Sequence, residues 1–198
     1  MLNGLKIICY AFAVLASFSF FEACTDDVEQ NQQYNVEFEK QKKESLEKAN
    51  RYMVLKENED IDNYIERHHL HIERIGTGLC YSIVKQGDTK PIEKGNLVTM
   101  EYEVRKLSGD LVYSSKENGP MSFIVGIGGV ESGLEEAIVH LHKDDVAVII
   151  IPSYYAHGLL GDGNRIPPKT PIVYNVKIIP QNPHQNPPLY KLFWKFLY

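Results

Sequence analysis

Apolar and polar residues alternate with a period of two along much of the second half of the chain. This alternation predicts β-strands over residues 79–85 and 97–107, and the Ser-Gly-Asp triplet at 108–110 predicts a tight turn after the second strand. A continuous β-branched run at 146–151 predicts a strand that is buried on both faces or nearly so. Residues 172–179 predict the last strand of the sheet.

One short helix is expected between these strands. It follows Glu131-Ser132-Gly133, and its apolar face is formed by Leu134, Ala137, Ile138 and Leu141. Antiparallel strands with a single helix indicate an α+β domain, in which a β-sheet wraps around that helix. We assign this domain to residues 71–180.

The residues before this domain have a different pattern. Residues 25–35 are polar and rich in Gln and Asn, which predicts a flexible tether. From Val36 apolar residues recur every three or four positions, and the polar stretch 58–60 divides them into two predicted helices. Residues 24–70 are therefore expected to form a tether and a helical leader. The apolar residues that recur over 36–68 would form one face of these helices, which would pack on the following domain or on a partner protein.

The N-terminus has the composition of a secretory signal peptide over residues 1–23. Lys6 precedes an apolar run, 7–21, that is shorter than the roughly 20 residues of a spanning helix. An uncleaved anchor or a buried helix is the alternative. The segment before Cys24 resembles a bacterial lipobox, although Glu22 stands where a small residue is usual. This resemblance implies lipid attachment at Cys24 and a lipoprotein of the bacterial cell envelope. The acidic residues at 26–29 resemble a surface-export signal of Bacteroidota lipoproteins, or they belong to a solvated tether.

Net charge and the positions of Cys and His limit the kinds of ligand and site to expect in this chain. The net charge of −5 argues against nucleic-acid binding. Cys80 would be the only thiol left in the mature fold, so we expect a buried or half-buried thiol and no internal disulfide. The three histidines at 68, 69 and 71 lack further ligands at a convincing spacing, so we predict a helix end there and neither a metal site nor a cofactor.

The C-terminal segment, 181–198, is a proline-rich linker that ends in the aromatic tail LYKLFWKFLY. This tail is too short to span a membrane. It could lie on a membrane interface, dock on the domain or bind an envelope partner, and docking is favoured because exposed apolar peptides aggregate.

The order of motifs between Gly78 and Ile179 resembles the FKBP-type peptidyl-prolyl isomerases. The motifs are, in chain order, GLCYSIVKQG, KGNLVTMEYEV, SGDLVYSS, MSFIVG, VESGLEEAI, IPSYYAHG and IPPKTPIVYNV. No single motif is sufficient, and the order and spacing of all of them carry the resemblance.

The resemblance implies an apolar cup that binds a proline ring. Its catalytic residues would be Tyr102, Phe123, His157, Ile166 and Tyr174. Its substrate-binding residues would be Val112, Tyr113, Met121, Val130, Glu131 and Leu134, with Glu131 acting through its backbone N–H, so that a change of its side chain would cost little. Substrates would be proline-containing peptides or proteins.

Several cup positions depart from the family pattern. Leu134 stands where many members have Trp, and Val112 and Met121 stand where aromatic residues are usual. Tyr113 replaces an Asp, which removes a buried carboxylate, and His157 replaces a Tyr that donates to the peptide. These departures predict a weak isomerase or a cup adapted to other peptides.

Two functions follow from these patterns. The first is a lipid-anchored isomerase that assists the folding of exported proteins, with a layout similar to gliding-associated FKBP lipoproteins of Bacteroidota. The alternative is an FKBP-fold binding module in an envelope complex, used in gliding or secretion, with weak or no isomerase activity.

Overall fold

The computed structural model describes residues 26–87 and 90–180, and it begins with one long helix, α2 (Asp26–Arg67). The predictions of a flexible tether over 25–35 and of two helices separated at 58–60 are therefore wrong for the described part of that region. The 42 residues of α2 contain neither Gly nor Pro, and Gln, Glu and Lys are good helix formers. A polar stretch alone does not end a helix, because a helix also needs a residue that stops it.

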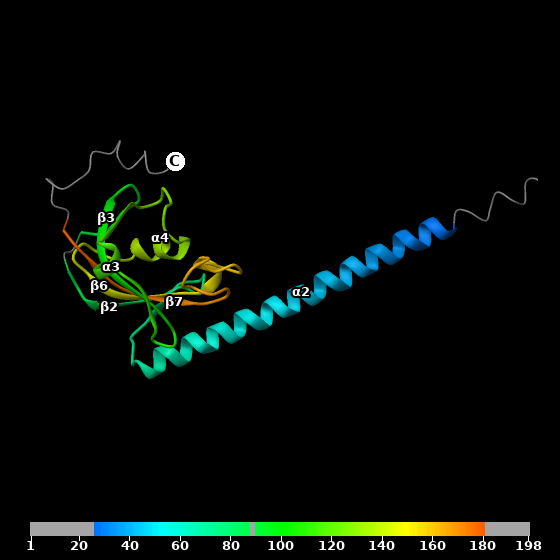
Figure 1. Cartoon of the computed structure of the whole chain (residues 1–198), viewed down its shortest axis with the longest axis horizontal. Helices are drawn as coiled ribbons and strands as arrows, with labels where there is room; N and C mark the ends of the chain where they lie inside the picture. Colours follow the sequence, from blue (N-terminus) through cyan, green and yellow to red (C-terminus); the bar gives the residue numbers. More distant parts are fainter. Residues whose placement is uncertain (1–25, 88–89, 181–198) are drawn as a thin grey trace, which may run out of the picture. The chain divides into compact units, whose positions relative to one another are not determined.

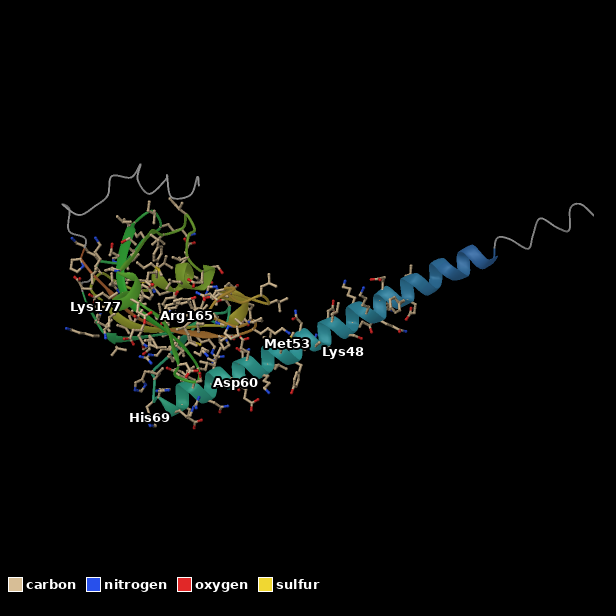
Figure 2. All side chains as sticks on the ribbon, in the orientation of Figure 1. Lys48, Met53, Asp60, His69, Arg165 and Lys177 are labelled. Atoms are coloured by element: carbon tan, nitrogen blue, oxygen red, sulfur yellow. The ribbon has the colours of Figure 1, made fainter. Side chains whose placement is uncertain are left out.

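The chain divides into two compact units, residues 1–53 and 54–198. Figure 2 labels Met53, the last residue of the first unit, and Asp60 in the second. The end of α2 thus belongs to the unit that contains the sheet, although the sequence pattern assigned it to the leader. Ile61 and Tyr64 form a buried apolar cluster with Cys80, Ile150 and Val173, which explains this assignment.

A seven-stranded antiparallel sheet forms the second unit, with the order β1-β2-β6-β7-β3-β4. The fifth strand, β5, pairs with the first half of β3, and β4 pairs with its second half. The strands are β1 (Glu73–Arg74), β2 (Cys80–Lys85), β3 (Leu97–Lys106), β4 (Leu111–Ser114), β5 (Met121–Ile124), β6 (Val146–Ile151) and β7 (Ile172–Ile178).

The short helix α4 (Ser132–Ile138) lies on one face of this sheet (Figure 1). Leu134, Ala137 and Ile138 are fully buried in the main core. A Cβ at Gly133 would lie 2.3 Å from Cγ2 of Ile151, so the absence of a side chain there lets α4 approach β6 closely. The predicted α+β fold is confirmed.

The four strands predicted from periodicity are also confirmed, and β6 is buried along most of its length. The predicted turn after β3 is present, since the N–H of Gly109 donates to the carbonyl of Lys106 at 2.9 Å. Two short elements add to the single expected helix. They are the one-turn helix α3 (Ser115–Asn118) and the 3₁₀ turn η1 (Ser153–Tyr155).

The predictions about Cys80 and the histidine segment can be compared with the structure. Cys80 is a free, fully buried cysteine, and burial raises the pKa of its thiol, as expected of an unreactive core residue. The ring of His68 packs against Tyr64 just beyond the end of α2, with ring centroids 4.2 Å apart and the ring planes tilted by 37°. In the described ranges, no three His, Cys, Asp or Glu side chains are arranged to hold a metal ion.

No helix within residues 26–87 and 90–180 combines the length and the apolar character needed to cross a membrane. The predicted signal peptide, the lipid site at Cys24 and the C-terminal segment 181–198 lie outside the described residues.

Candidate functional site

The residues of the predicted cup come from four strands of the sheet, from α4 and the residues before it, and from the loop after η1. Tyr102 of β3 and Tyr174 of β7 are on the same face, because Val104, two residues after Tyr102, pairs with Tyr174. Their ring centroids are 6.3 Å apart. Phe123 of β5 and Leu134 of α4 belong to the same buried cluster. A strand face and a helix face therefore supply the apolar walls.

The structure brings together all the residues that the resemblance assigned to the cup. The main buried cluster contains Tyr102, Val112, Phe123, Leu134, Ile166 and Tyr174. Packed against it, and only partly buried, are Tyr113, Met121 and Val130. Glu131 and His157 join the cup through polar contacts. The same cluster also contains core residues outside the cup, such as Leu79 and Ile149, and the individual roles of the cup residues remain predictions.

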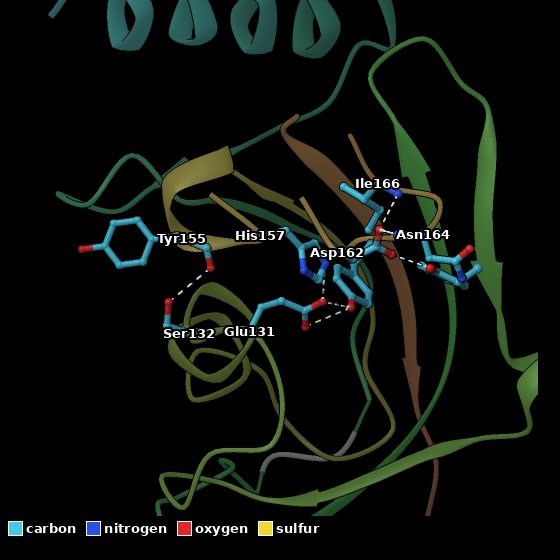
Figure 3. Close-up of polar contacts among 9 residues, drawn as sticks. Glu131, Ser132, Tyr155, His157, Asp162, Asn164 and Ile166 are labelled. Carbon is cyan, nitrogen blue, oxygen red and sulfur yellow. Dashed lines mark hydrogen bonds and ion pairs between the residues drawn. The ribbon is translucent and has the colours of Figure 1, made fainter. Parts of the chain in front are cut away.

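The side chain of Glu131 lies inside this site (Figure 3). The Tyr174 hydroxyl donates to its carboxylate, 3.0 Å from Oε1 and 3.1 Å from Oε2. Nε2 of His157 lies 3.0 Å from Oε1, so the ring N–H can donate to the same carboxylate. The carboxylate thus links β7 to the loop that follows η1, a side-chain role that the expectation of a main-chain role alone did not include.

Tyr174 is almost completely buried, at 2% exposure. Burial first, and then the neighbouring Glu131 carboxylate, raise the pKa of Tyr174 far above its ordinary value. The hydroxyl therefore stays protonated and acts as a permanent donor to Glu131.

A second carboxylate, Asp162, shapes the loop that carries Ile166. Its Oδ1 accepts hydrogen bonds from the N–H groups of Asn164 at 2.9 Å and Ile166 at 2.8 Å, and its Oδ2 accepts one from the Tyr113 hydroxyl. Burial opposes ionisation of Asp162, but these three donors and the nearby His157 outweigh it and lower the pKa to about 2.

These contacts change the interpretation of Tyr113. Its replacement of Asp was expected to remove a carboxylate from the site, yet Asp162 supplies one to the Tyr113 hydroxyl. The loop is tight here, since a Cβ at Gly161 would lie 2.2 Å from the carbonyl oxygen of Ile166. The sequence Asp162-Gly163-Asn164 is typical of a side-chain-capped turn and could have indicated this role.

Glu57, near the end of α2, is a further residue that the sequence did not indicate. Its carboxylate accepts hydrogen bonds from the N–H and the hydroxyl of Ser153, both at 2.6 Å. Ser153 opens η1, which leads directly to His157. The two partners are 96 positions apart, so no local pattern could reveal the contact.

Arg165 stabilises the outer side of the same loop. Its guanidinium donates to the carbonyl of Val112 at 2.8 Å and to Glu117 at 3.2 Å, and it lies 5.4 Å from the ring centroid of Tyr113. The loop is thus tied to β4 and α3 as well as to α2.

The chemistry available in this cup is binding and desolvation. Aromatic and aliphatic side chains line the walls, and an imidazole and a phenol supply polar contacts. Rotation about an amide bond makes and breaks no covalent bond, so it requires an apolar setting and well-placed donors.

Comparisons with known proteins agree with this geometry. The family model described as "FKBP-type peptidyl-prolyl cis-trans isomerase" matches residues 88–179. A protein of Neisseria meningitidis serogroup B, the probable FKBP-type peptidyl-prolyl cis-trans isomerase FkpA, is 35% identical over 118 residues. That match covers 59% of this chain and 43% of the relative, so the chain spans less than half of its length.

Shorter relatives are covered almost completely. FK506-binding protein 1 of Kluyveromyces lactis is 34% identical, and the match covers 48% of this chain and 86% of that protein. FK506-binding protein 1 of Saccharomyces cerevisiae is 32% identical, and the match covers 56% of this chain and 91% of that protein.

Solved structures share the fold. The crystal structure of AtFKBP13 superposes with a TM-score of 0.53 at 22% identity, over 57% of this chain and 99% of that one. A peptidyl-prolyl cis-trans isomerase of Pseudomonas syringae pv. tomato gives a TM-score of 0.50 at 24% identity, over 55% and 79%. With near-complete coverage of relatives more than 30% identical, this chain belongs to the family of FKBP-type peptidyl-prolyl cis-trans isomerases.

Proposed function

We propose that this protein catalyses the cis–trans isomerisation of X–Pro peptide bonds in exported proteins. The observation that supports this most is the convergence of the cup residues, from β3, β4, β5, α4, β7 and the loop after η1, on one buried cluster. Single aromatic residues of this kind occur in any core. Their assembly in the order of this family, together with the contacts of Glu131 with Tyr174 and His157, supports a site rather than ordinary packing.

The reaction needs little beyond this cup. The barrier to rotation about a peptide bond is roughly 18–20 kcal/mol, and it arises from sharing of the nitrogen lone pair with the carbonyl. A dry cup disfavours the charge separation of the planar amide. Tyr102, Phe123 and Tyr174 grip the proline ring, and Ile166 covers it. The Glu131 N–H donates to the peptide, and the His157 N–H does so when it exchanges the Glu131 carboxylate for the peptide carbonyl. Both contacts favour the twisted amide over the planar one.

The proposed location is the bacterial cell envelope. In this proposal a signal peptide over 1–23 is removed and a lipid on Cys24 anchors the chain to a membrane. Mass spectrometry of the mature protein tests this, because acylation adds the mass of the lipid to a peptide that begins at Cys24. A mature N-terminus elsewhere, or an unmodified Cys24, would contradict the anchor without affecting the isomerase proposal.

The activity is tested by NMR exchange spectroscopy on an Ala-Leu-Pro-Phe peptide, with and without protein. We expect faster exchange between the cis and trans signals with the wild type, and at least a tenfold loss of kcat/KM for Tyr102→Ala. Glu101→Gln, on the same strand but exposed, is the control and should retain full activity. Exchange no faster than in buffer would refute the enzyme function.

A binding module in an envelope complex is the second candidate, supported by the first unit alone. Leu46 and Tyr52 are 62% and 67% exposed on α2, and large apolar side chains exposed on one helix suit a protein partner. In a deletion strain, rescue of the phenotype by Tyr102→Ala but not by Leu46→Glu with Tyr52→Glu would favour the binding module. The reverse result would favour the isomerase.

A further inference from the structure

An ionisable side chain in the proline cup is an unexpected feature of this site. The side chain of Glu131 is only 14% exposed, and its carboxylate contacts the neutral Tyr174 hydroxyl and the His157 ring. Burying a carboxylate is costly unless it is paired and hydrogen-bonded. A ligand that brings a positive charge to Glu131 would therefore gain more than a neutral ligand.

The neighbouring charged groups Asp162 and Arg165 are already engaged. Asp162 accepts three hydrogen bonds from its own loop and from Tyr113, and Arg165 donates to Val112 and Glu117. Among the described residues, the groups that contact the Glu131 carboxylate are the Tyr174 hydroxyl and the His157 ring, whose Nε2 lies 3.0 Å from Oε1. The guanidinium of Arg165 is thus directed toward Val112 and Glu117, away from the Glu131 carboxylate.

We propose that Glu131 is a specificity-determining residue that selects peptides with Lys or Arg immediately before the proline. The inference rests on the proposed isomerase function and defines its substrate class. The residue before proline carries the carbonyl of the bond that rotates, and this carbonyl is the acceptor for the cup donors. His157 is one of these donors, and its Nε2 lies 3.0 Å from Oε1 of Glu131. A peptide carbonyl bound to His157 therefore places the side chain of the residue before proline beside the Glu131 carboxylate.

An acidic residue before proline has the opposite effect. It would bring a second negative charge to a poorly solvated carboxylate, and like charges in such a setting repel strongly. Selectivity is the difference in binding free energy between peptides with a basic and with an acidic residue before proline. Attraction of the first and repulsion of the second therefore both increase it. A neutral residue such as Leu would fall between them.

The test is NMR exchange with three peptides, Ala-Xaa-Pro-Phe with Xaa as Lys, Leu or Glu, on the full chain. We expect a Lys-to-Glu ratio in kcat/KM of roughly tenfold for the wild type, which corresponds to about 1.4 kcal/mol. Glu131→Gln keeps an acceptor for Tyr174 and removes the charge, so the ratio should fall to about one. Glu131→Asp keeps the charge and should keep the preference for Lys.

Two controls separate a local effect of the Glu131 charge from a change in net charge or in folding. Glu101→Gln makes the same change in net charge at an exposed site, and it should leave the ratio at the wild-type value. Thermal unfolding of each variant shows whether it is folded. Turnover of the Leu peptide with equal rates for Lys and Glu would refute the selectivity and leave the isomerase function standing. Turnover of none of the peptides would refute both.

Discussion

The hydroxyl of Tyr174 donates to the carboxylate of Glu131, so a residue of the last strand and the residue that precedes α4 are joined across the proposed cup. The contact places a carboxylate among the apolar side chains of the predicted cup. It also orients Glu131 toward His157, which connects the rigid sheet to the loop.

Removing only the hydroxyl of Tyr174 should separate the contribution of its hydrogen bond from that of its buried ring. Tyr174→Phe keeps the buried ring and loses the hydrogen bond to a charged group, so we expect a loss of about 1.5–3 kcal/mol in the free energy of unfolding. Tyr174→Ala also removes the ring from the core and should cost about 3–5 kcal/mol. Urea denaturation at pH 7 measures both changes. Equal stability of Tyr174→Phe and the wild type would show that the hydroxyl contributes nothing.

The low pKa of Asp162 predicts an acid-dependent loss of stability. The pKa of Asp162 is about 2 in the folded protein, against 3.8 for the free side chain, so its contribution is present above about pH 4 and disappears as the pH falls toward 2. Asp162→Asn should be about 1 kcal/mol less stable than the wild type at pH 7, since partial exposure reduces the full effect. Near pH 2 this difference should vanish.

Urea denaturation at pH 7, 4 and 2 checks this prediction, with Asp60→Asn as the control. Asp60 is an exposed residue of α2, and Asp60→Asn makes the same change in net charge. A difference between Asp162→Asn and the wild type that stays constant from pH 7 to pH 2 would contradict the assignment.

Much of the sheet could be predicted because strand periodicity is a local property. Alternation along β3 and the β-branched run of β6 are both visible within a few residues, and each has its expected burial. The length of α2 was not predicted, since the polar residues 58–60 were interpreted as a break although nothing there disfavours helical backbone. Absence of Gly and Pro was the more informative signal.

The site shows the same division between local and distant information. Motif order indicated the apolar cup, because β3, β4, β5 and β7 each carry residues assigned to it. The side-chain roles of Glu131 and Glu57 depend on partners 43 and 96 positions away, respectively. Only the folded chain brings such pairs together, so the motifs indicated a main-chain role alone for Glu131 and no role for Glu57.

Glu57 should act as a positioning residue for the loop. Glu57→Ala removes both acceptors of Ser153, so we expect a loss of about 1.5–3 kcal/mol in stability and faster hydrogen exchange in residues 153–158. If the loop places His157, kcat should fall more than KM rises, and Glu57→Gln should recover part of the loss. Glu59→Ala, at an exposed site on the same helix, is the control. Unchanged exchange in 153–158 would show that Glu57 does not hold the loop.

The end of α2 should be an integral part of the isomerase domain. Ile61 is fully buried against residues of β2, β6 and β7, so Ile61→Ala creates a cavity and should cost about 2–5 kcal/mol in unfolding free energy. Leu55, on the same helix and in the same unit, is 63% exposed, and Leu55→Ala should change stability by less than about 0.5 kcal/mol. Urea denaturation of both variants gives the comparison. Equal, small losses of unfolding free energy in the two variants would mean that the helix end packs only loosely on the sheet. A larger loss for Ile61→Ala, as expected, implies that a domain cut at residue 71 is less stable than one that begins at Val54.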